Sequence, residues 1–276
     1  MKSGLVEGLP YSLSRWTDVP GDEGKWAWFK TQVKQGSMIA IDPRSAIPSY
    51  WSLHPEDTLG LVFWTKNPEN LVFDAPWLKN YRFKAHLTVT GWTEVERGAG
   101  SLRQQLDRLY AAATTFGPDR VTWRFSPVPM VSDVVRRFEE IATTASRAGL
   151  DRVYLSFLQE NDLMPETRSP EDRANLLVQM AEVGAGRGIR VLLCNEDRTL
   201  QSNLHPNLAS GICAPPEDFS LPDRQVSPSE GCGCVLMVDP FTLNESCSIG
   251  CEYCYAADKH FAPKKQNTTR TLPIIR

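Results

Sequence analysis

Three cysteines lie close together near the end of the chain, at Cys247, Cys251 and Cys254, in the spacing C-x3-C-x2-C. A single short loop with this spacing can bring three thiolates to one metal centre. Because a [4Fe–4S] cluster takes four ligands, three protein thiolates leave one iron open to a cofactor or substrate. The competing interpretation is a structural zinc site, which usually pairs a C-x2-C with a second such pair or with two histidines. The spacing therefore favours an open cluster site.

The remaining cysteines are Cys194, Cys213, Cys232 and Cys234. Four thiolates suit a closed tetrahedral site that holds either zinc or an auxiliary iron–sulfur cluster. The glycines on both sides of Cys232 would let the backbone turn tightly around a metal. Alternatively, Cys194 is a buried small apolar residue, as free cysteine often is. A second metal site is therefore one of two open interpretations.

The motif C-E-Y-C-Y-A at residues 251–256 resembles the signature of the radical S-adenosylmethionine (SAM) superfamily, and particularly its spore photoproduct lyase branch. The chain also resembles an uncharacterised bacterial and phage family with this late motif, through S-R-W-T-D at residues 14–18 and F-W-T-K-N-P at residues 63–68. The resemblance implies a [4Fe–4S] cluster on the three clustered cysteines and SAM on its open iron. It further implies an electron donor such as flavodoxin or ferredoxin, reductive cleavage of SAM to a 5′-deoxyadenosyl radical, and hydrogen abstraction from a substrate.

The resemblance also assigns roles to individual side chains. Tyr253 stands at the aromatic position that packs near the adenine of SAM, and Thr17 and Asp18 follow the strand whose end binds the SAM amine. Lys66 or Arg124 would hold the SAM carboxylate or an anionic group of the substrate, since basic side chains pair with carboxylates. Asp18 could equally begin a turn, because it precedes Val-Pro in the sequence.

Short apolar segments alternate with amphipathic segments along most of the chain. The apolar pattern predicts strands at residues 38–41, 59–65, 81–90, 121–125, 153–157 and 190–194. Helical spacing appears at residues 102–116 and 134–145, and a third helix begins with Ser169 as its cap and Pro170 in its first turn. This alternation predicts an α/β fold, a complete or partial (β/α) TIM-type barrel.

The late position of the cysteine motif indicates an unusual strand order. In most radical SAM proteins this loop follows the first barrel strand, so the resemblance implies a circularly permuted barrel in which residues 235–238 take that strand's place. The expected organisation is one integrated domain. Residues 1–196 would form the barrel units, 197–234 an irregular Cys- and Pro-rich segment with the possible auxiliary site, and 235–276 the final strand, cluster loop and basic tail.

The composition restricts the class of protein. The net charge of −3 gives no overall attraction to nucleic acid, although the basic tail after Asp258 could contact phosphates or simply be solvated. No apolar run is long enough for a membrane span, and the N-terminal residues do not form a secretory segment. Seven cysteines, an odd number, argue against a disulfide framework. These features favour a reduced, cytoplasmic metalloenzyme without a membrane partner.

The sequence therefore predicts a radical SAM enzyme of open reaction class: lyase, isomerase or transferase. Its substrate would be a small molecule or a nucleic acid. The lyase-like motif suggests a nucleobase or modified thymine, and hence DNA modification. The alternative is a zinc-stabilised module that binds nucleic acid or protein without catalysis. Metal analysis separates the two, because an enzyme of this kind contains iron and sulfide whereas the module contains zinc.

Overall fold

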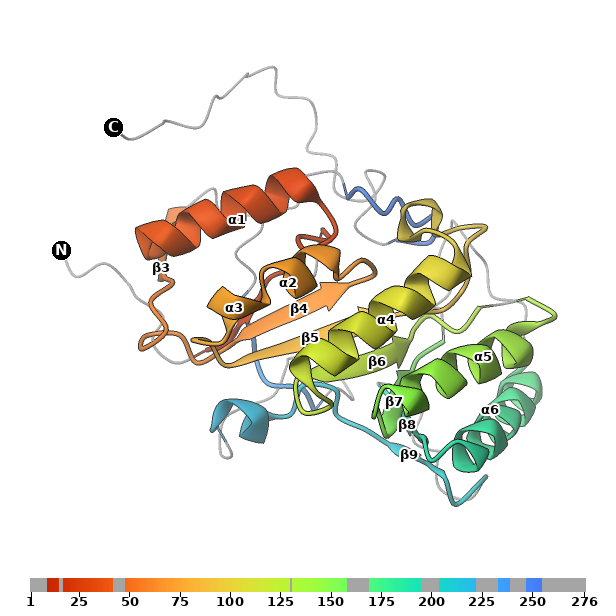
Figure 1. The fold of residues 1–276 in the computed structure, drawn as a ribbon. Helices are drawn as coiled ribbons and strands as arrows, with labels where there is room; N and C mark the ends of the chain where they lie inside the picture. Colours follow the sequence, from red (N-terminus) through yellow and green to blue (C-terminus); the bar gives the residue numbers. More distant parts are fainter. Residues whose placement is uncertain are drawn as a thin grey trace.

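The structure is a computed structural model that describes residues 9–14, 17–41, 48–129, 131–157, 169–194, 204–221, 233–238 and 247–254. Its centre is a seven-stranded parallel sheet (Figure 1). In their order across the sheet, the strands are β1 (Tyr11–Ser12), β4 (Leu61–Thr65), β5 (Phe83–Thr88), β6 (Val121–Phe125), β7 (Arg152–Leu155), β8 (Arg190–Leu193) and β9 (Leu208–Ser210).

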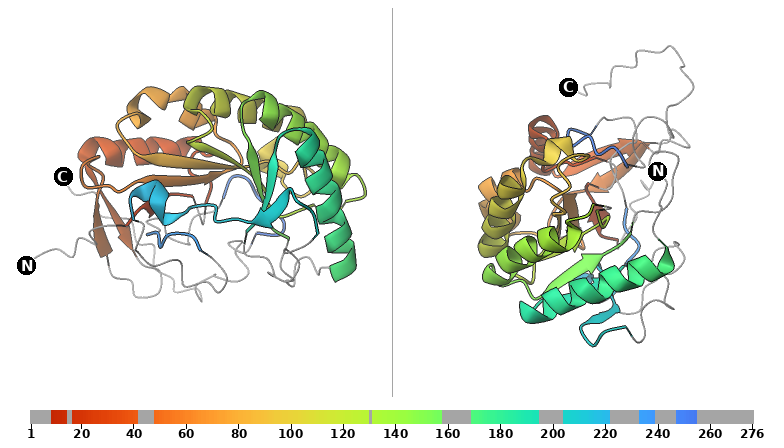
Figure 2. Two further views of the ribbon diagram at one scale, coloured as in Figure 1. Left: turned by 90° about the horizontal axis from the view of Figure 1, so that it is seen from below. Right: turned by 90° about the vertical axis from the view of Figure 1, so that its right-hand side faces the viewer.

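The helices cover one face of this sheet in an arc (Figure 2). They are α1 (Glu23–Gln35), α2 (Glu69–Phe73), α3 (Ala75–Leu78), α4 (Leu102–Phe116), α5 (Val134–Arg147) and α6 (Pro170–Gly186), together with the short 3-10 helix η1 (Arg97–Ala99). At least one helix follows each of the strands β4, β5, β6 and β7 before the next strand of the sheet, which is the predicted α/β alternation. Such a curved parallel sheet with outer helices is consistent with a partial barrel.

The two faces of the sheet differ because side chains alternate along a strand. On β6, Val121, Trp123 and Phe125 are buried in the hydrophobic core beneath the helices. Thr122 and Arg124 consequently point to the opposite face. The side of the sheet away from the helices is here called the concave face. On β6 this face carries the polar side chains, while the apolar side chains of the strand are buried beneath the helices.

Residues 211–221 cross the concave face from β9 to the 3-10 helix η3 (Pro216–Phe219), on the side of the sheet opposite the helices (Figure 2). The Tyr154 hydroxyl donates to the Ile212 carbonyl at 2.9 Å, and Lys84 forms an ion pair with Asp218 at 2.9 Å. Phe219 is fully buried. Both β9 and η3 lie within the segment for which the composition predicted irregular structure.

Residues 233–238 bring the late part of the chain to the first strand. The Ser12 amide donates to the Val238 carbonyl at 2.7 Å, and the Val238 amide donates to the Pro10 carbonyl at 3.0 Å. Val238 thereby forms a single parallel bridge with Tyr11 rather than a full strand. Residues 235–238, which the sequence predicted as a final strand, thus lie beside β1 through this one bridge.

Several local predictions are confirmed and others differ. Residues 121–125 and 102–116 form β6 and α4 as expected, and Ser169 caps α6 in a capping box with Asp172. The predicted strand at residues 38–41 exists as β2 (Ser37–Ile41), but it pairs antiparallel with β3 (Pro48–Ser52) in a separate sheet. Its partner lies a few residues ahead in the chain, so a local hairpin forms instead of a distant parallel pairing. None of the described helices is long and apolar enough to cross a membrane.

Candidate functional site

The loop of residues 247–254 packs against the chain that follows β5. The Gly98 amide donates to the Ile249 carbonyl at 2.8 Å, and the Glu252 amide donates to the Val95 carbonyl at 3.0 Å. Ile249 is buried, while the three cysteines of the loop are each partly buried. Two backbone hydrogen bonds and one apolar anchor therefore fix the loop and leave its thiols accessible.

The close approach at Gly98 yields a testable prediction. A Cβ at this position would lie 2.6 Å from the Ile249 Cα and closer still to the Ser248 carbonyl oxygen. Both are backbone atoms, so Gly98→Ala is expected to displace the loop, to lower the free energy of unfolding by about 1–3 kcal/mol and to reduce iron uptake. Anaerobic reconstitution followed by iron assay measures this effect. Gly186→Ala is the control, because its Cβ would meet nothing within 4 Å. Equal iron content in Gly98→Ala and Gly186→Ala would show that the close approach at Gly98 is not needed for the cysteine loop to take up iron.

Asp18 connects the loop to the ends of β1 and β4. Its amide donates to the Cys247 Sγ at 3.4 Å. Its carboxylate accepts hydrogen bonds from the Thr65 hydroxyl at 2.6 Å, the Lys66 amide at 2.7 Å and the Gly21 amide at 2.9 Å. Burial raises the pKa of Asp18, although these hydrogen bonds oppose the effect. The Asp18 carboxylate therefore joins the end of β4 to the chain before α1. The Asp18 backbone N–H donates to the Cys247 sulfur. That Asp18 binds the amine of SAM remains a prediction.

Thr17 lies next to Asp18 and is also buried. Its hydroxyl accepts a hydrogen bond from the Lys25 ammonium at 2.8 Å, so α1 supplies a positive charge near the end of β1. Residues 15 and 16, which belong to the S-R-W-T-D motif, lie outside the described residues. The structure thus places Asp18 in contact with the cysteine loop and Thr17 next to it in the chain, and the predicted binding of the SAM amine by these residues stays a prediction.

A buried carboxylate, Glu96, organises the other side of the loop. Glu96 is fully buried, pairs with Cys251 in an antiparallel bridge, and accepts a hydrogen bond from the Lys66 ammonium at 2.9 Å. The Tyr253 hydroxyl donates to the same oxygen, Oε1, and the Tyr253 ring stacks on Trp92 with centroids 5.6 Å apart. The other oxygen, Oε2, is buried and has no hydrogen-bond partner among the described residues. Lys66 and Tyr253, both predicted site residues, therefore meet at a carboxylate that the sequence analysis missed.

The surroundings of Cys251 favour a neutral thiol until a cation binds. Burial raises the pKa of Cys251 to about 12. The nearby Lys66 opposes this shift, while Glu96 and the other two cysteines add to it. Thiolates repel one another, so three of them can stand together only around a positive centre. Metal binding supplies that charge and releases the thiol protons.

Arg124, the alternative candidate for an anion, lies elsewhere on the concave face. Its guanidinium lies over the Trp64 ring at 4.9 Å, and Trp64 stacks on His86 with ring centroids 4.2 Å apart. His86 is fully buried, and its pKa is lowered to about 3, by burial first and then by the Arg124 charge. Within the described ranges, neither ring nitrogen of His86 has a hydrogen-bond partner. Among the predicted basic residues, the contacts therefore place Lys66 at the cysteine loop and Arg124 in an aromatic stack.

The second group of cysteines also comes together. The Cys213 Sγ lies 3.7 Å from the Cys194 Sγ and 3.3 Å from the Cys234 Sγ. These distances exceed a disulfide bond of about 2.05 Å, so the sulfurs are in contact but not bonded. Cys232, the fourth predicted member, lies outside the described residues. Within the described ranges, no three or more His, Cys, Asp and Glu side chains already surround a single metal position.

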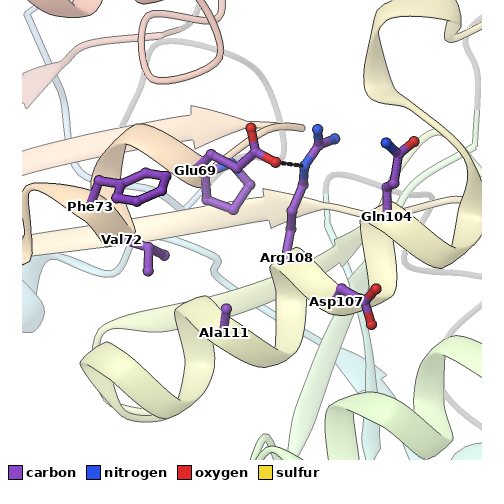
Figure 3. Close-up of a pocket in the computed structure, with 8 residues that line it drawn as sticks. Glu69, Val72, Phe73, Gln104, Asp107, Arg108 and Ala111 are labelled. Atoms are coloured by element: carbon purple, nitrogen blue, oxygen red, sulfur yellow. Dashed lines mark hydrogen bonds and ion pairs between the residues drawn. The ribbon is translucent and has the colours of Figure 1, made fainter.

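A pocket of about 390 Å³ opens between α2 and α4, in the helical layer (Figure 3). Glu69 and Arg108 form an ion pair across it at 2.9 Å, and Arg108 also donates to the Ala99 carbonyl at 2.7 Å. Asp107 at its edge pairs with Arg103. Its charged groups are thus paired with one another or with a residue of the same helix, so the candidate site is the cysteine loop and not this pocket.

Comparisons with known proteins give a family but no activity. A family model described as "Domain of unknown function (DUF1848)" matches residues 11–256, a range that includes every cysteine of the chain. The search of curated proteins and the search of solved structures each returned no match. Because the family model spans most of the sequence, the chain belongs to the DUF1848 family.

Proposed function

We propose that this protein is a radical SAM enzyme whose [4Fe–4S] cluster is held by Cys247, Cys251 and Cys254. The observation that carries the proposal is the loop itself. It presents three partly buried thiols on eight residues that the backbone of residues 95–98 holds in place. Three thiolates leave one iron of a cubane without a protein ligand, and that iron is the position where SAM would bind.

The surroundings of the loop suit a cluster. The Asp18 amide already points at the Cys247 sulfur, and backbone N–H groups stabilise sulfur ligands once these carry negative charge. The Lys66 ammonium adds a positive charge beside Cys251. The Oε2 atom of Glu96 offers a buried acceptor to which no residue in the described part of the chain donates. When bound, the cluster and SAM together would supply an alkyl radical able to remove a hydrogen atom from a substrate.

The protein's own residues would bind and orient SAM and the substrate and would shield them from water. Tyr253 and Trp92 form a stacked aromatic wall next to the loop, suited to a flat ring such as adenine. Lys66 and Glu96 fix the position of Tyr253 through a buried charge pair. Strand ends on the concave face would exclude water from the reacting atoms, as is usual when the site lies at the carboxyl ends of parallel strands.

We further propose that the fold is a circularly permuted partial barrel. The support is the pairing of Val238 with Tyr11, followed within ten residues by Cys247. In this arrangement residues 235–238 would act as the first strand, and the cysteine loop would follow it as it does in other radical SAM proteins. The proposed permutation explains why the motif lies so late in the sequence.

The direct test of activity is product formation. After anaerobic reconstitution with iron and sulfide, the protein is expected to hold about four irons and four sulfides in this cluster and to release 5′-deoxyadenosine from SAM upon reduction. Stoichiometric zinc at the loop with no 5′-deoxyadenosine would favour the non-catalytic zinc module instead.

The nucleobase substrate stays a proposal that a binding measurement tests. A DNA enzyme that contacts phosphates would bind oligonucleotides with an affinity that falls steeply as salt increases. Binding that is absent, or that salt leaves unchanged, would remove DNA as the substrate and leave small molecules.

A further inference from the structure

We propose that Cys194, Cys213 and Cys234 form a second, mononuclear metal site that binds Zn²⁺ and stabilises the concave side of the sheet. The three thiols come from segments far apart in the sequence: the end of β8, the chain after β9, and residues 233–238. They meet without a disulfide, with sulfur contacts of 3.7 and 3.3 Å. This site does not depend on the chemistry proposed for the cysteine loop.

The sulfur spacing selects a single metal ion over a cluster. Zinc binds thiolates at about 2.3 Å in a tetrahedron, which places neighbouring sulfurs roughly 3.8 Å apart. Thiolates on different irons of a cubane lie farther apart, because each projects outward from its own iron. The two observed contacts, 3.7 and 3.3 Å, are closer to the spacing around one ion than to the spacing around a cubane. The three side chains do not yet surround one position, so binding must rotate at least one thiol.

The surroundings suit a structural site. Cys213 and Cys234 are each 5% exposed and pack with a small apolar cluster on the concave face. The cluster includes Val62, Tyr154, Phe219 and Val235. Burial of these two thiols keeps water away from the metal position, which suits an ion that stabilises the fold rather than one that activates a bound water. The sequence offers Cys232 as a fourth thiolate, but it is the other three that carry the proposal.

The site would connect the two edges of the sheet. The Val235 amide donates to the Ala214 carbonyl at 2.8 Å, next to Cys213 and Cys234, while Val238 pairs with Tyr11 at the β1 edge. A metal on the three cysteines would therefore hold residues 233–238 between the chain after β9 and β1. Because structural zinc binding contributes directly to the free energy of folding, removing the ion is expected to destabilise the whole chain.

The test measures zinc in the full-length protein, purified without added iron, for the wild type, Cys213→Ser and Cys251→Ser. We expect about one tightly held zinc per chain in the wild type and in Cys251→Ser, and its loss in Cys213→Ser. Zinc that disappears in Cys251→Ser and persists in Cys213→Ser would place the ion on the cysteine loop and overturn the proposal. Iron and sulfide lost only in Cys213→Ser would show a second cluster and overturn it as well.

A second measurement covers the case in which Cys213→Ser fails to fold. Wild-type protein is exchanged with Co²⁺, which replaces zinc in tetrahedral thiolate sites and gives intense thiolate-to-cobalt absorption. We expect this absorption together with a melting temperature that falls when a chelator removes the ion. Absence of the thiolate bands, or a melting temperature that the chelator leaves unchanged, would overturn the proposal. Formation of 5′-deoxyadenosine is assayed separately, so failure of either proposal is seen without the other.

Discussion

Replacing Cys251 with alanine is expected to reduce 5′-deoxyadenosine formation to the background rate measured without protein. Cys251 lies at the centre of the cysteine loop, pairs with Glu96 through the backbone and has Lys66 nearby. Its removal leaves two thiols, and a cubane held by two protein thiolates lacks the ligand set that a SAM-binding cluster requires. The product is measured by chromatography after anaerobic reconstitution and reduction with dithionite.

The matched control is Ser248→Ala on the same loop. Ser248 is exposed and its hydroxyl donates to the Gly21 carbonyl at a long distance, 3.5 Å, so this variant is expected to cleave SAM at the wild-type rate. Circular dichroism shows whether both variants keep the fold. A Cys251→Ala protein that still forms product at the wild-type rate would be incompatible with the proposed cluster.

The second large effect is expected at the buried pair of Lys66 and Glu96. Their side chains are 12% and 0% exposed, and Lys66 Nζ lies 2.9 Å from Glu96 Oε1. Glu96→Gln leaves the lysine charge largely buried without its partner, so we expect the free energy of unfolding to fall by about 3–5 kcal/mol. The double variant Glu96→Gln/Lys66→Met removes the unpaired charge as well and should be more stable than Glu96→Gln alone.

Urea unfolding of the four members of this double-mutant cycle, all in the same metal state, gives the coupling energy. The control is the exposed pair of Arg103 and Asp107, whose side chains are 83% and 62% exposed. Breaking such a surface pair should change the free energy of unfolding by at most about 1 kcal/mol. Additive effects of Glu96→Gln and Lys66→Met would mean that the two charges do not stabilise each other.

The elements that the sequence revealed are those with long, regular patterns. In β6 the sequence V-T-W-R-F alternates fully, and in α4 an amphipathic stretch follows a capping serine, Ser101. The two-residue β1 and three-residue β9 are too short to show any period. Helix α1 carries a visible cap at Asp22 and a left-handed Gly36 at its end, but its buried residues are few and polar residues interrupt them. Its packing is therefore decided by tertiary contacts.

The cysteine loop could be predicted from the sequence because its three cysteines lie within eight residues. Glu96 could not, because its partners are Lys66, 30 residues away, and Tyr253, 157 residues away. A carboxylate in a polar segment after a strand gives no local sign that folding will bury it. The sulfur contacts among Cys194, Cys213 and Cys234 likewise depend on the chain crossing the concave face. The number of cysteines could suggest a second metal site, but it could not predict the distances between the sulfur atoms.

The most direct test of the proposed function is the electron paramagnetic resonance spectrum of the reconstituted, reduced protein with and without SAM. We expect the signal of a reduced [4Fe–4S] cluster, and we expect SAM to shift it, because three thiolates from Cys247, Cys251 and Cys254 leave one iron open to the cofactor. A protein that takes up no iron, or a cluster signal that SAM leaves unchanged, would contradict the proposed function.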